Sequence, residues 1–100
     1  MSVTVLSKNR ISIRLTEERW AHIMEEHGEL RGMQTVILAT VADPDQILLG
    51  STEEYLAVRE LEPGKWMVVV YREGAEDGFI ITAFLTRKRR QLDRRIQLWP

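Results

Sequence analysis

Hydrophobic and polar residues alternate in two short segments near the N-terminus, residues 3–6 and 11–14, and four polar residues separate the segments. A repeat of two is typical of a β-strand with one buried side. The two segments therefore predict either a β-hairpin or one interrupted strand.

The pattern becomes helical after Thr16, which is followed by two acidic residues, as an N-cap often is. The acid that a capping box requires three residues later is missing, because Arg19 holds that position. We expect this helix to run to about His27 and to end at Gly28, a natural left-handed terminator. A second helix is expected over residues 30–42, because apolar residues recur there on one side.

Three strands are expected to follow, connected by the glycine-bearing hairpin turns "EPG" and "EGAEDG". The first runs from "QILLGS" into "EYLAVREL", the second is "KWMVVVYR" and the third is "FIITAFLT". The basic segment 87–100 favours a further helix, with Leu92, Ile96 and Trp99 as its packing residues. The order predicts an α+β fold: two N-terminal helices packed on an antiparallel β-meander sheet, then a basic C-terminal segment.

The composition narrows the class of protein. A chain of 100 residues allows one domain, 1–100, and 44% hydrophobic with 29% charged residues is typical of a globular protein. The absence of cysteine excludes a disulfide and a thiolate zinc site, and it suits a reducing compartment. No apolar run approaches the ~20 residues of a membrane helix, and no signal peptide is recognisable. We expect a cytoplasmic monomer or homodimer with no membrane association.

The net charge of −1 conceals an asymmetry, because residues 1–86 carry 8 Lys and Arg against 14 Asp and Glu, whereas residues 87–100 carry 6 against 1. The basic tail can approach phosphates, while the acidic body repels them. The alternative interpretation is that the tail pairs with carboxylates of the body and contributes to solubility.

The two histidines, His22 and His27, are five residues apart and therefore about 140° apart around a straight helix. They cannot hold one metal ion together, so we expect no metal site and no cofactor. His27 shares a stripe with Trp20 and Ile23 and should face inward, as a packed or capping residue or as a catalytic base. His22 falls among glutamates on the polar side.

The expected hairpins also predict the two faces of the sheet. If Leu61 lies opposite Lys65 and Arg72 opposite Phe79, one face is almost wholly apolar and should be packed. Its members are Leu56, Val58, Trp66, Val68, Val70, Phe79, Ile81, Ala83 and Leu85. The opposite face then carries a polar floor, defined as Tyr55, Arg59, Lys65, Tyr71, Thr82 and Thr86. Cations and hydroxyls suit phosphodiester chemistry without a metal, but a solvated sheet face is also normally polar.

Several segments together resemble a known family. They are "LTEERWAHIMEEHGE", "DPDQIL", a Tyr-bearing strand, "WMVVVY" and "ITAFLT", within about Ile11 to Thr86. These resemble the phage-associated branch of the BECR nuclease fold, which groups barnase-like, EndoU-like, colicin-type and RelE-like ribonucleases. The sequence departs from that pattern at Gly28, where the family has proline. The resemblance implies a compact, metal-independent α+β ribonuclease, often a toxin or effector.

We therefore expect cleavage of RNA phosphodiester bonds by general acid–base chemistry, and control of this activity by an inhibitory partner protein. By position, the resemblance implies catalytic roles for His22, His27, Arg59 and Thr82, and His27 is the first choice if only one histidine is catalytic. The expected substrate-binding residues are Lys65, Tyr71 and Thr86. Two alternatives remain at this level: a non-enzymatic protein-binding module, and a degenerate nuclease-fold scaffold.

Overall fold

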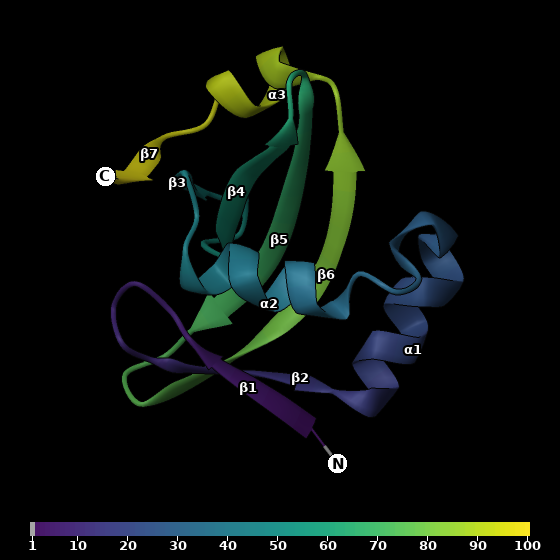
Figure 1. Ribbon diagram of the computed structural model, residues 1–100. Coiled ribbons are helices and arrows are strands. Elements are labelled where there is room, and N and C mark those ends of the chain that lie inside the picture. Colours follow the sequence, from purple (N-terminus) through teal and green to yellow (C-terminus); the bar gives the residue numbers. More distant parts are fainter. Residues whose placement is uncertain (1) are drawn as a thin grey trace.

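One sheet dominates the computed structural model, which describes residues 2–100, and the fold is α+β as the sequence predicted. Within these residues seven strands lie in the order β1-β2-β6-β5-β4-β3-β7 (Figure 1). The strands are β1 (Ser2–Leu6), β2 (Ser12–Thr16), β3 (Gln46–Leu49), β4 (Tyr55–Glu62), β5 (Lys65–Glu73), β6 (Asp77–Thr86) and β7 (Gln97–Trp99). The helices are α1 (Glu17–Glu26), the 3-10 turn η1 (Gly28–Leu30), α2 (Gln34–Ala42) and α3 (Arg89–Asp93). No helix in this part of the chain is both long and apolar enough to cross a membrane.

The N-terminal segments form a hairpin, because β1 pairs with β2 in antiparallel fashion. The alternating pattern allowed either a hairpin or one interrupted strand, and the structure shows the hairpin. The strand β2 then pairs with β6 in parallel, with Ile13 opposite Gly78. The sheet is therefore mixed, and the predicted antiparallel meander describes only its β3–β6 part.

The helix α1 begins where its cap predicts, since the hydroxyl of Thr16 accepts a hydrogen bond from the Arg19 amide at 3.1 Å. It ends one residue early, with His27 as C-cap and the His27 amide donating to the Ile23 carbonyl at 2.7 Å. The expectation for Gly28 was wrong: this residue opens η1, and the positive φ of +80° belongs to Gly32. Because residues 28–32 make this turn, α2 starts at Gln34 and not at residue 30.

The first strand of the predicted meander is in fact two strands. The segment between β3 and β4 folds back, with the Gly50 amide donating to the Glu54 carbonyl at 2.7 Å. The Glu54 carboxylate accepts bonds from the Thr52 amide at 2.8 Å and from the Thr52 hydroxyl at 3.0 Å. Bonding to the Thr52 amide lowers the pKa of Glu54 from its usual value. These local hydrogen bonds turn the chain at residues 50–54, where the sequence predicted one continuous strand.

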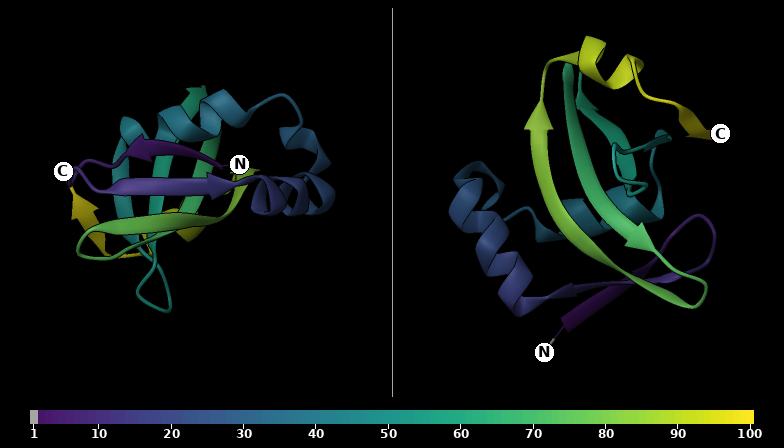
Figure 2. Two further views of the ribbon diagram at one scale, coloured as in Figure 1. Left: turned by 90° about the horizontal axis from the view of Figure 1, so that it is seen from below. Right: turned by 180° about the vertical axis from the view of Figure 1, so that it is seen from behind.

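The sheet has two covered faces (Figures 1 and 2). The helix face packs against α2 and the inner side of α1, and its core includes Ile23, Ile37, Met67, Val69 and Tyr71. The tail face packs against α3, whose buried Leu92 contacts a cluster of Leu48, Leu56, Val58 and Val68. The helices are therefore not all on one side of the sheet.

The C-terminal segment differs from the predicted single helix. Helical structure is confined to Arg89–Asp93, and residues 97–99 form β7, which pairs with β3. Of the three expected packing residues, Leu92 is 4% exposed but Ile96 is 65% exposed, and Trp99 is partly buried. Strand pairing thus replaces helical packing at the end of the chain.

Candidate functional site

The first predicted register is confirmed over most of its length. Arg59 lies opposite Met67, as predicted, and the same register continues to the pair Tyr55 and Tyr71. Near the turn an irregularity after Glu60 places Lys65 opposite Glu62, and not opposite Leu61. The positions of Tyr55, Arg59 and Tyr71 on one face were therefore predicted from the sequence.

The second register is correct only up to a β-bulge in β6. Arg72 pairs with Phe79 and Tyr71 with Ile80, as predicted, but Val70 then pairs with Thr82. Ile81 is the extra residue, so every later side chain of β6 moves to the opposite face. Thr82, Phe84 and Thr86 consequently belong to the tail face, and Ala83 and Leu85 to the helix face.

The predicted polar floor does not form. Its face is the helix face, on which Met67, Val69 and Tyr71 are fully buried beneath α1 and α2. The face predicted to be packed is the tail face, which α3 covers in part. Both faces carry apolar side chains, so alternation alone did not indicate which face the N-terminal helices cover.

Tyr71 has no access to a substrate, because the side chain is fully buried. Its hydroxyl has no hydrogen-bond partner within residues 2–100, and the ring meets Tyr55 edge-on at a centroid distance of 5.6 Å. Burial raises the pKa of Tyr71 well above its usual value. The burial of Tyr71 therefore argues against its predicted substrate-binding role.

The remaining floor residues separate. Arg59 lines a pocket of about 290 Å³ between β4 and α2, together with Thr35, Val36 and Ala39. It lies two strands from β6, or roughly 10 Å, and on the face opposite to Thr82.

Lys65 and Thr86 do come together. They line a pocket of about 280 Å³ with Glu29, Leu85 and Arg87. A carboxylate oxygen of Glu29 also lies 3.7 Å from His27 Nδ1, so this pocket adjoins the second histidine.

The two histidines lie on the helix that runs beside β6. Because β2 is parallel to β6 and leads directly into α1, the helix and β6 run in the same direction (Figure 1). The His27 ring lies 6.4 Å from the Phe84 ring, centroid to centroid, and the His27 side chain is 34% exposed. Its position outside the regular helix, as C-cap, brings it to β6.

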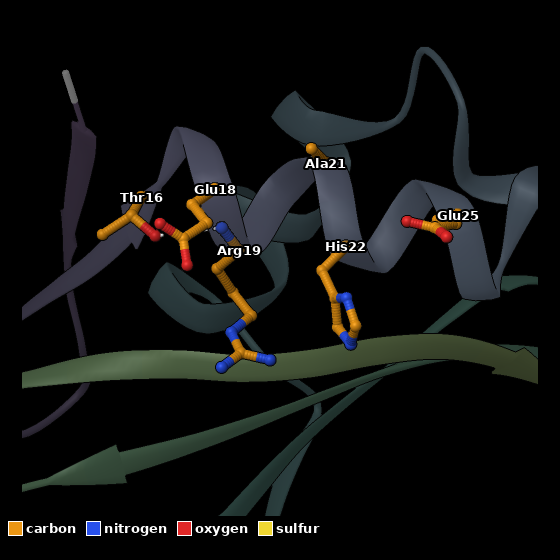
Figure 3. Close-up of a pocket in the computed structure, with 6 residues that line it drawn as sticks. All are labelled: Thr16, Glu18, Arg19, Ala21, His22 and Glu25. Atoms are coloured by element: carbon orange, nitrogen blue, oxygen red, sulfur yellow. Dashed lines mark hydrogen bonds between the residues drawn. The ribbon is translucent and has the colours of Figure 1, made fainter.

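His22 extends in the same general direction. Figure 3 shows the side chains of Arg19 and His22 reaching from α1 toward β6, at a pocket of about 410 Å³. His22 Nε2 lies 3.0 Å from a carboxylate oxygen of Glu26, which fixes the orientation of the ring. Glu18 and Glu25 line the same pocket and disfavour a polyanion on its outer side.

The spacing along the two elements brings these groups level with one another. The five residues from His22 to His27 rise about 7.5 Å along the helix axis, and the two residues from Thr82 to Phe84 rise about 6.6 Å along the strand. Since His27 is beside Phe84 and the two elements run in the same direction, position 22 of α1 is approximately level with position 82 of β6. We call Arg19, His22, His27, Thr82 and Phe84 the α1–β6 site.

Arg19 is the residue of this site that sequence reasoning missed. It was considered only as a residue in the position of a capping acid. Its spacing of three residues from His22 places the two on one side of a helix, and this was the available signal.

The chemistry of the α1–β6 site follows from its groups. Two imidazoles can supply a proton acceptor and a proton donor, a guanidinium stabilises negative charge, and a hydroxyl donates a hydrogen bond. Within residues 2–100 no three His, Asp or Glu side chains gather as metal ligands do. Comparisons with protein-family models, curated proteins and solved structures find no match for this chain.

Proposed function

We propose that the protein is a ribonuclease that cleaves RNA phosphodiester bonds at the α1–β6 site, without a metal ion, by general acid–base chemistry. The observation that carries the proposal is the position of Arg19 and His22 on α1 and of His27 at its C-cap, along the part of β6 that carries the partly buried Thr82 and Phe84. Such an enzyme would act in the cytoplasm as a toxin or phage-derived effector, restrained by an inhibitory partner protein.

The proposed reaction is an attack of the ribose 2′-hydroxyl on the adjacent phosphorus. His22, held by Glu26, takes the proton from this hydroxyl, as a carboxylate-oriented imidazole does in other enzymes. His27 gives a proton to the departing 5′-oxygen, and the products are a 2′,3′-cyclic phosphate and a free 5′-hydroxyl.

Arg19 and Thr82 act on the phosphate itself. The guanidinium of Arg19 balances the charge that develops on the non-bridging oxygens, and the Thr82 hydroxyl orients one of them. Arg19 thus takes the role that the sequence assigned to Arg59. Lys65 and Thr86, in the adjoining pocket, are proposed to bind the neighbouring part of the RNA.

The test is cleavage of labelled mixed-sequence RNA in the presence of EDTA, with wild type, His22→Ala, His27→Ala and Arg19→Gln. Each histidine variant should lose about 10² or more in rate, and Arg19→Gln should lose about 10²-fold. Arg59→Gln is the matched control, since it removes a cation outside the site, and it should retain activity within about threefold.

Three outcomes would contradict the proposal. Loss of wild-type cleavage in EDTA would indicate a metal-dependent reaction, and equal activity in all variants would indicate another site or a contaminant. Absence of cleavage by the wild type would indicate a degenerate scaffold or a binding module.

A protein-binding module is the second candidate, and one observation favours it. Both edges of the sheet expose apolar side chains: Val3 (40%) and Leu6 (56%) on β1, and Leu98 (45%) on β7. Open sheet edges accept an additional strand from another protein. An inactive wild type that forms a stable complex blocked by proline substitutions in β1 or β7 would support this candidate.

A further inference from the structure

The six cations of the C-terminal segment fall into two groups with different surroundings. In the first group, the Arg89 guanidinium lies 5.5 Å from the centre of the Trp66 ring, and its Nε lies 2.9 Å from Asp93. Arg95 donates to the Leu49 carbonyl at 3.4 Å, and Arg87 lies 3.5 Å from Glu62. These three arginines hold the segment against the sheet.

The second group is Lys88, Arg90 and Arg94. All three are exposed, and their side chains make no hydrogen bond or ion pair within the part of the chain that the structure describes. Arg90 of α3 and Arg94, its C-cap, are one turn apart, and each lies about 160° around the helix axis from the buried Leu92. Arg89 lies only about 60° from Leu92, which explains why it packs inward.

Unpaired cations one turn apart repel each other, so the second group weakens α3 and is not required by the fold. The chain carries 15 acidic residues, yet within residues 2–100 none forms an ion pair with Lys88, Arg90 or Arg94. Polar contacts between the charged side chains of the basic C-terminal segment and residues 2–86 are thus made by the first group of arginines and not by Lys88, Arg90 and Arg94. The second group is available to an external polyanion, whereas residues 1–86, with their excess of carboxylates, repel one.

The position of Lys88, Arg90 and Arg94 relative to β6 indicates which kind of polyanion they bind. The Lys88 amide donates to the Thr86 hydroxyl at 3.0 Å, and Thr86 is on the tail face with Thr82, about 13 Å away along the strand. A chain held at the α1–β6 site therefore reaches α3 after a few nucleotides. We propose that Lys88, Arg90 and Arg94 bind phosphates of a single-stranded RNA beyond the cleaved bond. This inference rests on the proposed function.

The test uses a labelled single-stranded RNA of ~20 nucleotides whose 2′-hydroxyls are methylated, so that no attacking hydroxyl is present. Its affinity is measured at several salt concentrations for wild type and for Arg90→Gln/Arg94→Gln. Loss of two phosphate contacts should weaken binding and reduce the slope of log K against log salt by about 1.4. Cleavage of a dinucleotide by the same variant should stay within about twofold of wild type.

The matched control is Arg10→Gln/Arg14→Gln, which changes the net charge equally on the exposed β1–β2 hairpin. Its slope should change by less than about 0.5. An unchanged slope in Arg90→Gln/Arg94→Gln, or an equal reduction in the control, overturns the inference. If the wild type cleaves no RNA but the slopes differ as expected, the proposed function fails while this binding site stands.

Discussion

Among single residues, Tyr71 is in the most unusual environment. Its side chain is fully buried, and its hydroxyl lacks a hydrogen-bond partner within residues 2–100. An unsatisfied buried hydroxyl costs about 1–3 kcal/mol, and burial holds the pKa of Tyr71 above its usual value. The ring is retained because it fills the core between β5 and α2, against Tyr55.

Tyr71→Phe removes this hydroxyl and keeps the ring. The free energy of unfolding at pH 7 should rise by about 1 kcal/mol, because the unsatisfied group is lost. Above pH ~10 the unfolded wild type releases the Tyr71 proton while the folded protein keeps it, so wild-type stability should fall by about 1.4 kcal/mol per pH unit relative to the variant. Urea denaturation at pH 7 and at alkaline pH measures both effects.

Tyr55→Phe is the control for this prediction, since Tyr55 is only partly buried. RNA cleavage by Tyr71→Phe should equal that of wild type. A stability loss above about 1 kcal/mol at neutral pH would mean that the hydroxyl has a bonding partner after all.

Among the elements, the contact of β2, β5 and β6 determines where α1 lies. Gly78 is the second residue of β6 and lies opposite both Ile13 of β2 and Glu73 of β5. A Cβ atom there would be 2.1 Å from the Arg72 carbonyl oxygen and 2.8 Å from Ile13 Cδ1. Only glycine lets β2 and β5 lie this close to β6 at position 78. Because α1 directly follows β2, the position of β2 in turn places α1 beside β6.

Gly78→Ala should destabilise the protein by about 1–3 kcal/mol, because backbone must move to accept the methyl group. The same shift should lower RNA cleavage by displacing α1 from β6. Thermal or urea unfolding and the EDTA cleavage assay measure the two effects.

Gly28→Ala provides the comparison, since a Cβ at Gly28 meets nothing within 4 Å and its φ is not positive. Its stability should remain within about 0.5 kcal/mol of wild type. Equal losses in the two variants would show that close packing at Gly78 does not matter.

At the scale of the whole molecule, the C-terminal segment completes the second core of the sheet. Leu92 is 4% exposed among Leu48, Leu56, Val58 and Val68, whereas Ile96 is 65% exposed. The segment therefore has a structural inner side, while Lys88, Arg90 and Arg94 on its outer side are exposed.

Leu92→Ala should reduce the free energy of unfolding by about 2–4 kcal/mol, because it leaves a cavity in the tail-face cluster. Ile96→Ala, an apolar truncation on the same segment, should change it by less than about 0.5 kcal/mol. Urea denaturation of both variants is the measurement. Comparable effects would mean that the segment does not pack through Leu92.

The sequence by itself determined the features that depend on neighbouring residues. Thr16 caps α1 because its hydroxyl and the Arg19 amide are three residues apart. The short turn after β4 also brings Arg59 opposite Met67, although the irregularity between Glu60 and Glu62 was not foreseen. Alternation indicated the N-terminal strands, and the α+β class followed from the order of elements. Capping, turns and periodicity act over a few residues and can be read along the chain.

Only the tertiary structure decided which residues meet. The bulge at Ile81 moves Thr82 to the tail face. The sequence does not indicate this bulge, because the pairing of β5 with β6 places apolar side chains on both faces of the sheet with or without it. The parallel pairing of β2 with β6 joins segments more than sixty residues apart, and α1, which follows β2, brings His27 beside Phe84. Such long-range contacts depend on the packing of whole elements, so the α1–β6 site was only partly visible in the sequence.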